Sequence, residues 1–161
     1  MDSFQWRPAL LAGGGAATKP PTLGVGSPRS PIRQVWPVEA ASLGVIAGLA
    51  AVPRTRRFAR RACEDWGIGG DPLDALQLIV TELATNAVMH SGSPTYTLIL
   101  TRTGDAVWVE VIDCGRWREE VDRCERTADG GRGWRLVREL AQRAGVERAA
   151  DGTCAWAEVF T

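Results

Sequence analysis

Three polar side chains recur at four-residue intervals within one apolar stretch of the sequence. Glu82, Asn86 and His90 fall among leucine, isoleucine, valine and alanine residues. Because residues four apart lie on the same face of an α-helix, the pattern predicts a polar stripe on a largely buried helix. The Asn86 amide oxygen is a suitable ligand for Mg²⁺, and the Glu82 carboxylate could take a proton from an attacking hydroxyl or orient it. The spacing alone also occurs by chance in many helices.

Two other segments have residues suited to a nucleotide. Asp113-Cys114-Gly115 follows a predicted strand, where a carboxylate can accept a hydrogen bond from an adenine amino group and a glycine allows close approach. An ordinary Asp-x-Gly turn is the alternative. Gly130-Gly131-Arg132-Gly133 precedes a predicted helix, whose N-terminal N–H groups favour phosphate. A flexible connector would explain these glycines equally well.

Local patterns predict the elements that must position these residues. The central helix should have Asp71 as its N-cap, Pro72 in its first turn and its end near His90, before Ser91-Gly92-Ser93-Pro94. Its buried face should consist of Leu73, Leu76, Val80, Leu83 and Ala87. A preceding helix starts near Val52-Pro53 and should bury Phe58, Ala62 and Trp66. Arginines occupy its other faces and could contact a partner, although a simple solvated face is the alternative.

Alternating apolar residues predict two hairpins. Residues 96–102 and 106–113 flank Thr103-Gly104-Asp105, and residues 146–149 and 153–160 flank Asp151-Gly152. Between the hairpins we expect a long polar loop over residues 114–129 and a helix over residues 134–144, with Gly145 as its C-cap. Before residue 51, a short strand near residues 35–38 and a weak helix or a loop after it are both possible, and the sequence does not decide between them.

Composition limits the class of protein. The 161 residues include 19 basic and 19 acidic side chains, so no net positive field indicates a nucleic-acid partner. Residues 1–35 are rich in Gly, Pro, Ala and Ser and predict a disordered extension, which leaves residues 36–161 as one domain. No apolar run predicts a membrane span or a signal peptide, so we expect a cytoplasmic protein. The four cysteines have no zinc-ligand spacing and should be free.

Taken together, the three segments resemble the motifs of the GHKL ATPase superfamily, and in particular the bacterial anti-sigma-factor serine/threonine kinases. The resemblance covers roughly residues 52–160. It implies the Bergerat ATP-binding fold, an α/β (α+β) two-layer sandwich with helices on one face of a mixed, mostly antiparallel sheet. It also implies ATP and Mg²⁺ as cofactors.

Roles for individual residues follow from the resemblance. Glu82 matches the catalytic carboxylate and Asn86 the metal-binding asparagine. The residues matching the rest of the nucleotide site are Asp113 and Gly115 near adenine, Thr153 near adenine in the last hairpin, and Gly131, Arg132 and Gly133 on the phosphate side. His90 matches a position often occupied by histidine, and we expect it to support the helix end.

The resemblance implies a kinase that phosphorylates Ser or Thr of an antagonist protein and that also binds a sigma factor. A non-catalytic module, in which nucleotide only sets the shape presented to a partner, is the main alternative. A third class is an interaction protein that has lost nucleotide binding. The sequence leaves open whether the domain forms a homodimer, and it does not identify the partner.

Overall fold

The computed structural model describes residues 38–115 and 132–161. The elements in these two ranges are, in chain order, β1 (Val38–Ile46), α1 (Ala51–Asp65), α2 (Gly70–His90), β2 (Thr95–Thr103), β3 (Ala106–Asp113), α4 (Arg132–Leu140), β4 (Arg143–Ala149) and β5 (Gly152–Phe160). The predicted extension over residues 1–35, most of the predicted loop after Cys114, and Gly131 lie outside the described residues.

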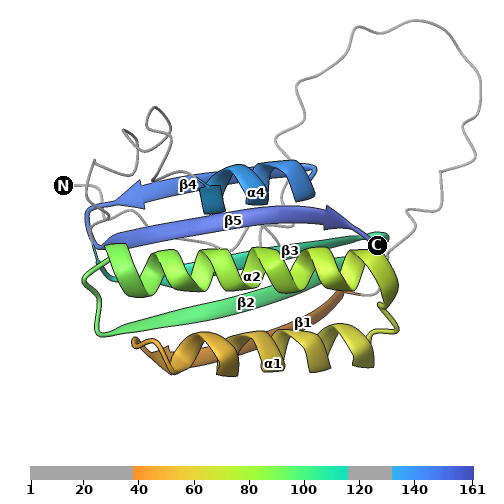
Figure 1. Cartoon of the computed structure of the whole chain (residues 1–161), viewed down its shortest axis with the longest axis horizontal. Coiled ribbons are helices and arrows are strands. Elements are labelled where there is room, and N and C mark those ends of the chain that lie inside the picture. Colours follow the sequence, from red (N-terminus) through yellow and green to blue (C-terminus); the bar gives the residue numbers. More distant parts are fainter. Residues whose placement is uncertain (1–37, 116–131) are drawn as a thin grey trace, which may run out of the picture. The chain divides into compact units, whose positions relative to one another are not determined.

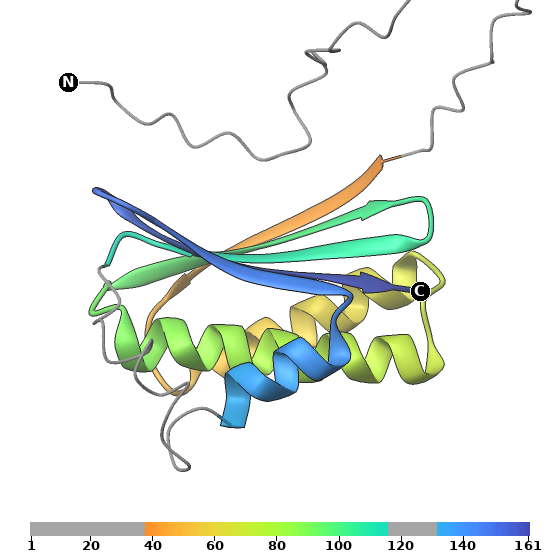
Figure 2. The same ribbon diagram turned by 90° about the horizontal axis from the view of Figure 1, so that it is seen from above.

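The strands form one sheet in the order β1-β2-β3-β5-β4, and all neighbouring strands are antiparallel. The helices α1, α2 and α4 pack against the same face of this sheet (Figures 1 and 2). The prediction of a two-layer α/β sandwich is therefore confirmed. In the described residues, no helix combines the length and the hydrophobicity that a membrane span requires.

The core lies between the sheet and α2. All five apolar residues predicted for the buried face of α2 are buried, and so are the inward residues of the central hairpin, namely Tyr96, Leu98, Leu100, Val107, Val109 and Val111. Alternation therefore predicted both the hairpin and its buried face. The prediction for α1 was less accurate. Phe58 and Trp66 are only partly buried, whereas Thr55, Ala59 and Cys63 join Ala62 in the interior.

Thr55 links α1 to the sheet through a buried hydrogen bond. Its hydroxyl lies 2.7 Å from the Tyr96 hydroxyl and also donates to the Ala51 carbonyl at 3.0 Å. Both side chains are almost fully buried. Because burying an unpaired hydroxyl is costly, this pair fixes how α1 sits on β2.

The first strand lies later in the chain than predicted. Of the range 35–38 only Val38 is described, and residues 39–46, where a weak helix or a loop was considered, continue as strand β1. β1 pairs with β2 along its whole length, from Val38 opposite Thr103 to Ile46 opposite Thr95. The exposed face of β1 includes the apolar residues Val38, Ala40 and Ile46, so the sequence lacks the alternation of apolar and polar residues that marks a strand with one solvated face. Pairing with β2 therefore determines this strand more than its own residues do.

Two helix boundaries differ from the predictions. α2 begins at Gly70 after Gly69, which makes no side-chain capping bond, so Asp71 is not the N-cap. Asp71 lies in the first turn, where its charge still favours the positive end of the helix dipole. α4 ends at Leu140, and Gly145 lies within β4 instead of capping the helix. A Cβ atom on Gly145 would lie 2.8 Å from Cζ2 of Trp156, so this glycine accommodates the indole of the neighbouring strand.

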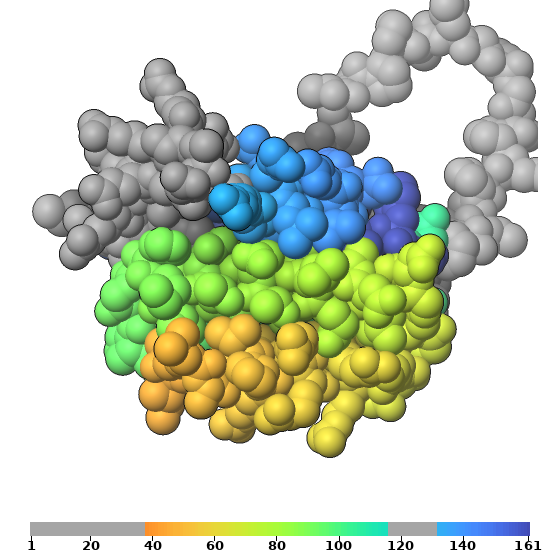
Figure 3. Space-filling model, in the orientation of Figure 1, coloured from red at the N-terminus to blue at the C-terminus, as the bar shows by residue number. Residues whose placement is uncertain are grey.

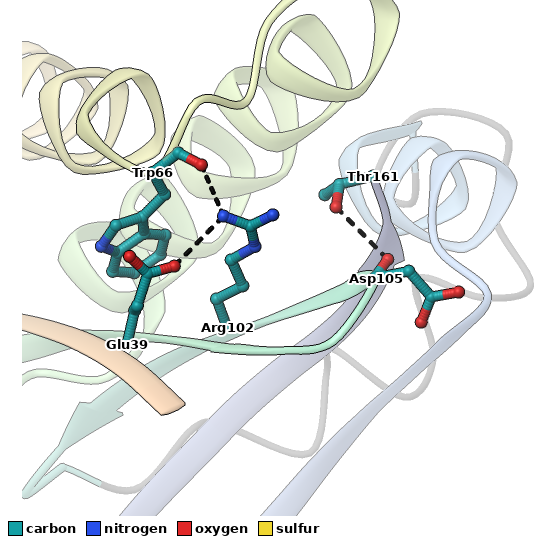
Figure 4. Close-up of polar contacts among 5 residues, drawn as sticks. All are labelled: Glu39, Trp66, Arg102, Asp105 and Thr161. Atoms are coloured by element: carbon teal, nitrogen blue, oxygen red, sulfur yellow. Dashed lines mark hydrogen bonds and ion pairs between the residues drawn. The ribbon is translucent and has the colours of Figure 1, made fainter. Parts of the chain in front are cut away.

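Polar contacts tie the turns at the end of the sheet away from the predicted site (Figure 4). Arg102 donates to the carbonyl oxygen of Trp66, at the end of α1, and its Nη1 lies 3.1 Å from Glu39 Oε2. The Thr161 hydroxyl donates to the Asp105 carbonyl at 3.3 Å. These bonds join the β2–β3 turn region to α1 and to the C-terminal residue.

Candidate functional site

Glu82 and Asn86 lie on one edge of α2. Both are partly exposed, whereas the adjacent Leu83 and Ala87 are buried in the core. The apolar face of α2 therefore fixes the helix, and its polar edge stays accessible. His90 is the last residue of α2 and is exposed.

The C-terminal end of α2 is held by two serines. The Ser91 hydroxyl donates to the Ala87 carbonyl at 2.6 Å and accepts the Ser93 N–H at 3.0 Å. The Ser93 hydroxyl donates to the Thr95 carbonyl at 2.6 Å. Ser91, and not His90, thus supplies the capping bond. The sequence pattern Ser-Gly-Ser-Pro indicated the break, and short hydroxyl side chains are also typical of such local bonds.

Asp113 is the last residue of β3, and its side chain is buried at the sheet edge. Its Oδ1 accepts the Gly115 N–H at 2.8 Å. Thr153, at the start of β5, pairs with Asp113 across the strands and donates its hydroxyl to the Gly115 carbonyl at 3.3 Å. The structure therefore brings Thr153 to Asp113 and Gly115, from which it is far apart in sequence.

Gly115 also connects this cluster to α2. A Cβ atom at position 115 would overlap the carbonyl oxygen of Ser91 and would lie 2.6 Å from its carbonyl carbon. Only glycine allows the backbone after β3 to approach the end of α2 this closely. The Cys114 N–H contributes a long hydrogen bond to the Ser93 hydroxyl, at 3.4 Å. Asp113 and Gly115 are thus fixed to the helix that bears Asn86.

The first turn of α4 lies against Glu82. A Cβ atom on Gly133 would overlap Oε2 of Glu82 and would lie 3.0 Å from its Cδ. Arg132 is the first residue of α4 and is exposed. The start of α4 runs beside α2 in both ribbon views (Figures 1 and 2). The Glu82 carboxylate is therefore next to the first turn of α4, at the positive end of the helix dipole, which also attracts phosphate.

The candidate site thus has two parts joined by α2. Asp113, Gly115 and Thr153 form one part, and Arg132 and Gly133 at the start of α4 form the other. Glu82 contacts the second part directly, and Asn86 lies one helical turn farther toward Ser91, which contacts the first. The buried Asp113 carboxylate can accept a hydrogen bond from adenine, and the N-terminus of α4 favours phosphate. These residues therefore fit ATP.

Two buried thiols of the domain, Cys154 and Cys63, are poor nucleophiles. Burial raises the pKa of Cys154, the neighbour of Thr153, to about 12, and nearby carboxylates add to the shift. Burial likewise raises the pKa of Cys63 to about 11. Cys114 is exposed. In the described residues, no three His, Cys, Asp or Glu side chains cluster as a metal site would require.

Comparison with known proteins identifies the fold. No curated protein sequence matches the chain. The RsbU and RsbW domains of Rv1364c from Mycobacterium tuberculosis are similar in structure, with a TM-score of 0.59 and 20% identity, covering 74% of this chain and 32% of that one. SiaB in the SiaB–SiaC complex from Pseudomonas aeruginosa has a TM-score of 0.54 and 10% identity, covering 74% and 89%.

The comparison by sequence covers most of the described domain. The profile of the histidine kinase-like ATPase domain matches residues 45–159, from the end of β1 to the end of β5. This range includes both parts of the candidate site and the helix that joins them. The match and the layered fold lead to one conclusion: the chain belongs to the family of histidine kinase-like ATPase domains.

Proposed function

We propose that the protein is an ATP-Mg²⁺-dependent serine/threonine kinase of the anti-sigma-factor type, which phosphorylates an antagonist protein. The contact of Glu82 with the first turn of α4 carries this proposal. It puts a carboxylate beside a helix N-terminus, a position that favours phosphate, so a protein hydroxyl could be positioned there for transfer. ATP would supply the phosphoryl group.

We assign each residue of the candidate site a task in this proposal. Asp113 would accept a hydrogen bond from the adenine amino group, with Gly115 and Thr153 shaping the same pocket edge. Gly131, Arg132 and the Gly133 N–H would neutralise phosphate charge. Asn86 would give one oxygen ligand to Mg²⁺, and phosphate oxygens and water would complete the octahedral set. Glu82 would orient the attacking hydroxyl and accept its proton.

A protein partner fits the similar structures. One of them is a complex of SiaB with SiaC, and the other contains an RsbW domain beside an RsbU domain. By analogy we propose an antagonist protein as the substrate and a sigma factor as a second partner, both met in the cytoplasm. A homodimer is compatible with this proposal.

Phosphoryl transfer from labelled ATP to candidate antagonist proteins tests the proposal. Glu82→Gln should keep ATP affinity in calorimetry and lower the transfer rate by about 10²-fold or more, because the carboxylate acts on the attacking hydroxyl and does not contact adenine. Asp74→Asn is the matched control, since it removes one exposed carboxylate from the same helix away from the site. Transfer by Glu82→Gln at the wild-type rate would exclude Glu82 as the base.

The second candidate function is a nucleotide-dependent binding module without catalysis. The partial exposure of both Glu82 and Asn86 is compatible with either function. In the module, Glu82→Gln would bind the partner and regulate it as the wild type does, whereas Asn86→Ala would lose both nucleotide and partner. Calorimetry with Mg-ATP decides whether nucleotide binds at all. Binding that is lost in Asp113→Ala would exclude a nucleotide-free interaction protein.

A further inference from the structure

The solvent face of α1 is rich in arginine, and its exposed acidic residues, Glu64 and Asp65, lie only at the C-terminal end of the helix. Five exposed arginines lie opposite the buried side of the helix: Arg54, Arg56, Arg57, Arg60 and Arg61. Arg60 pairs with Glu64 at 2.8 Å, where both side chains are about half exposed. Within residues 38–115 and 132–161, the other four arginines form no ion pair. The helix therefore presents a dense cationic surface with little internal compensation.

This arrangement lowers the stability of α1. The first turn has no acidic residue, and Arg54, Arg56 and Arg57 all lie in the first two turns, near the positive end of the helix dipole. Arg57 is also three residues from Arg54 and four from Arg61, spacings at which like charges repel by about 0.2–0.5 kcal/mol per pair. A face that merely keeps a helix in solution would carry both signs of charge. The arginines therefore indicate binding.

The surroundings of the arginines favour a protein ligand. The neutral side-chain amide of Gln77 on α2 donates a hydrogen bond to the Arg56 carbonyl at 3.2 Å, so this contact with α1 does not neutralise the arginine charge. Leu49 precedes α1 and is 74% exposed, so an apolar side chain flanks the charges. The chain as a whole has a net charge of zero, so no net positive field would attract a nucleic acid to it. Figure 3 shows α1 open to solvent along one edge of the helical layer.

We propose that the α1 arginine face, defined as these five residues, is a docking surface for an acidic segment of a protein partner. Guanidinium groups bind carboxylates through two parallel hydrogen bonds, which a row of arginines can repeat along one helix. The surface follows from charge and exposure alone. Only the identification of its ligand with the phosphorylated antagonist rests on the proposed function.

Fluorescence anisotropy on the full chain tests the surface without ATP. The probe is a labelled peptide of Glu, Ala and Leu that lacks Ser and Thr, so a failed kinase proposal does not affect the result. The test variant is the triple substitution Arg54→Gln, Arg57→Gln, Arg61→Gln. Its control, Arg135→Gln, Arg138→Gln, Arg148→Gln, removes the same charge from α4 and β4. A single-stranded oligonucleotide with the same number of negative charges is the competing ligand.

We expect the α1 variant to bind the acidic peptide about tenfold more weakly than the wild type, which corresponds to the loss of three exposed ion pairs. The control should bind as the wild type does. The α1 variant should unfold at the same or a higher temperature, because repulsion is removed, and this result would exclude misfolding as the cause.

Three results would overturn the inference. The first is a wild type that does not bind the peptide, or binds it no better than the α1 variant does. The second is an equal loss of affinity in the control, which would mean that only the total charge matters. The third is tighter, α1-dependent binding of the oligonucleotide, which would assign the surface to nucleic acid.

Discussion

Gly115→Ala tests whether the close contact between the β3 end and α2 builds the base-binding part of the site. The added Cβ would overlap the backbone carbonyl of Ser91. Ser91 is held in place because its hydroxyl donates a 2.6 Å hydrogen bond to the Ala87 carbonyl. Because neither backbone can move without breaking hydrogen bonds, we expect a loss of about 1–3 kcal/mol in unfolding free energy. For a domain of this size, that loss corresponds to a decrease in Tm of about 4–12 °C.

Gly133→Ala is the informative control. Its Cβ would meet only the carboxylate end of Glu82, which can rotate away. Alanine also favours a helix over glycine by up to about 1 kcal/mol, so this variant should have an unchanged or higher Tm. ATP affinity, measured by calorimetry, should fall in Gly115→Ala, whereas Gly133→Ala should lose mainly phosphoryl transfer. Equal Tm values for the two variants would refute the idea that Gly115 meets a rigid backbone and Gly133 a movable side chain.

Three further predictions concern the core and the sheet. Tyr96→Phe should lower the unfolding free energy in urea by about 1 kcal/mol, since it removes the buried bond to Thr55; no change would mean that the bond is not formed. Burial raises the pKa of Glu110. The folded protein therefore binds this proton more tightly than the unfolded chain does, and it loses stability as pH rises above the pKa of Glu110 in the unfolded chain. Glu110→Gln should therefore be more stable than the wild type at pH 7, and equal stability would contradict the assigned cost. The Cys63 and Cys154 thiols, with pKa values of about 11 and 12 against 9.0 when unfolded, bind more protons in the folded state. Stability should thus decline as pH rises above 9, and replacing both with alanine should reduce that decline.

Local patterns in the sequence predicted most of the fold. The apolar periodicity of α2 and the alternation around Gly104 depend only on neighbouring residues, and both elements form as predicted. The length of β1 and the end of α4 depend on distant contacts instead. β1 extends as far as its pairing with β2 allows, and Gly145 continues into β4 because the Trp156 ring occupies the space beside it.

The candidate site divides in the same way. The spacing of Glu82 and Asn86 places them on one edge of α2 as predicted, because that relation is set within a single helix. The register of β3 and β5 brings Thr153 opposite Asp113, which hydrophobic alternation alone does not specify. The serine bonds at the end of α2, and the contact of Ser91 with Gly115, require the folded chain.

These contacts give the two parts of the site different mechanical properties. The proposed adenine side contacts α2 through the backbones of Gly115 and Ser91, in a loop with several hydrogen bonds. The proposed phosphate side contacts α2 through a side chain, where Glu82 lies against Gly133. A shift of α4 can therefore reposition Glu82 by rotation of its side chain, while Asp113 stays fixed to the helix that bears Asn86. It follows that substitutions at the end of β3 should mainly lower nucleotide affinity, whereas changes to the contact between Glu82 and Gly133 should mainly lower phosphoryl transfer.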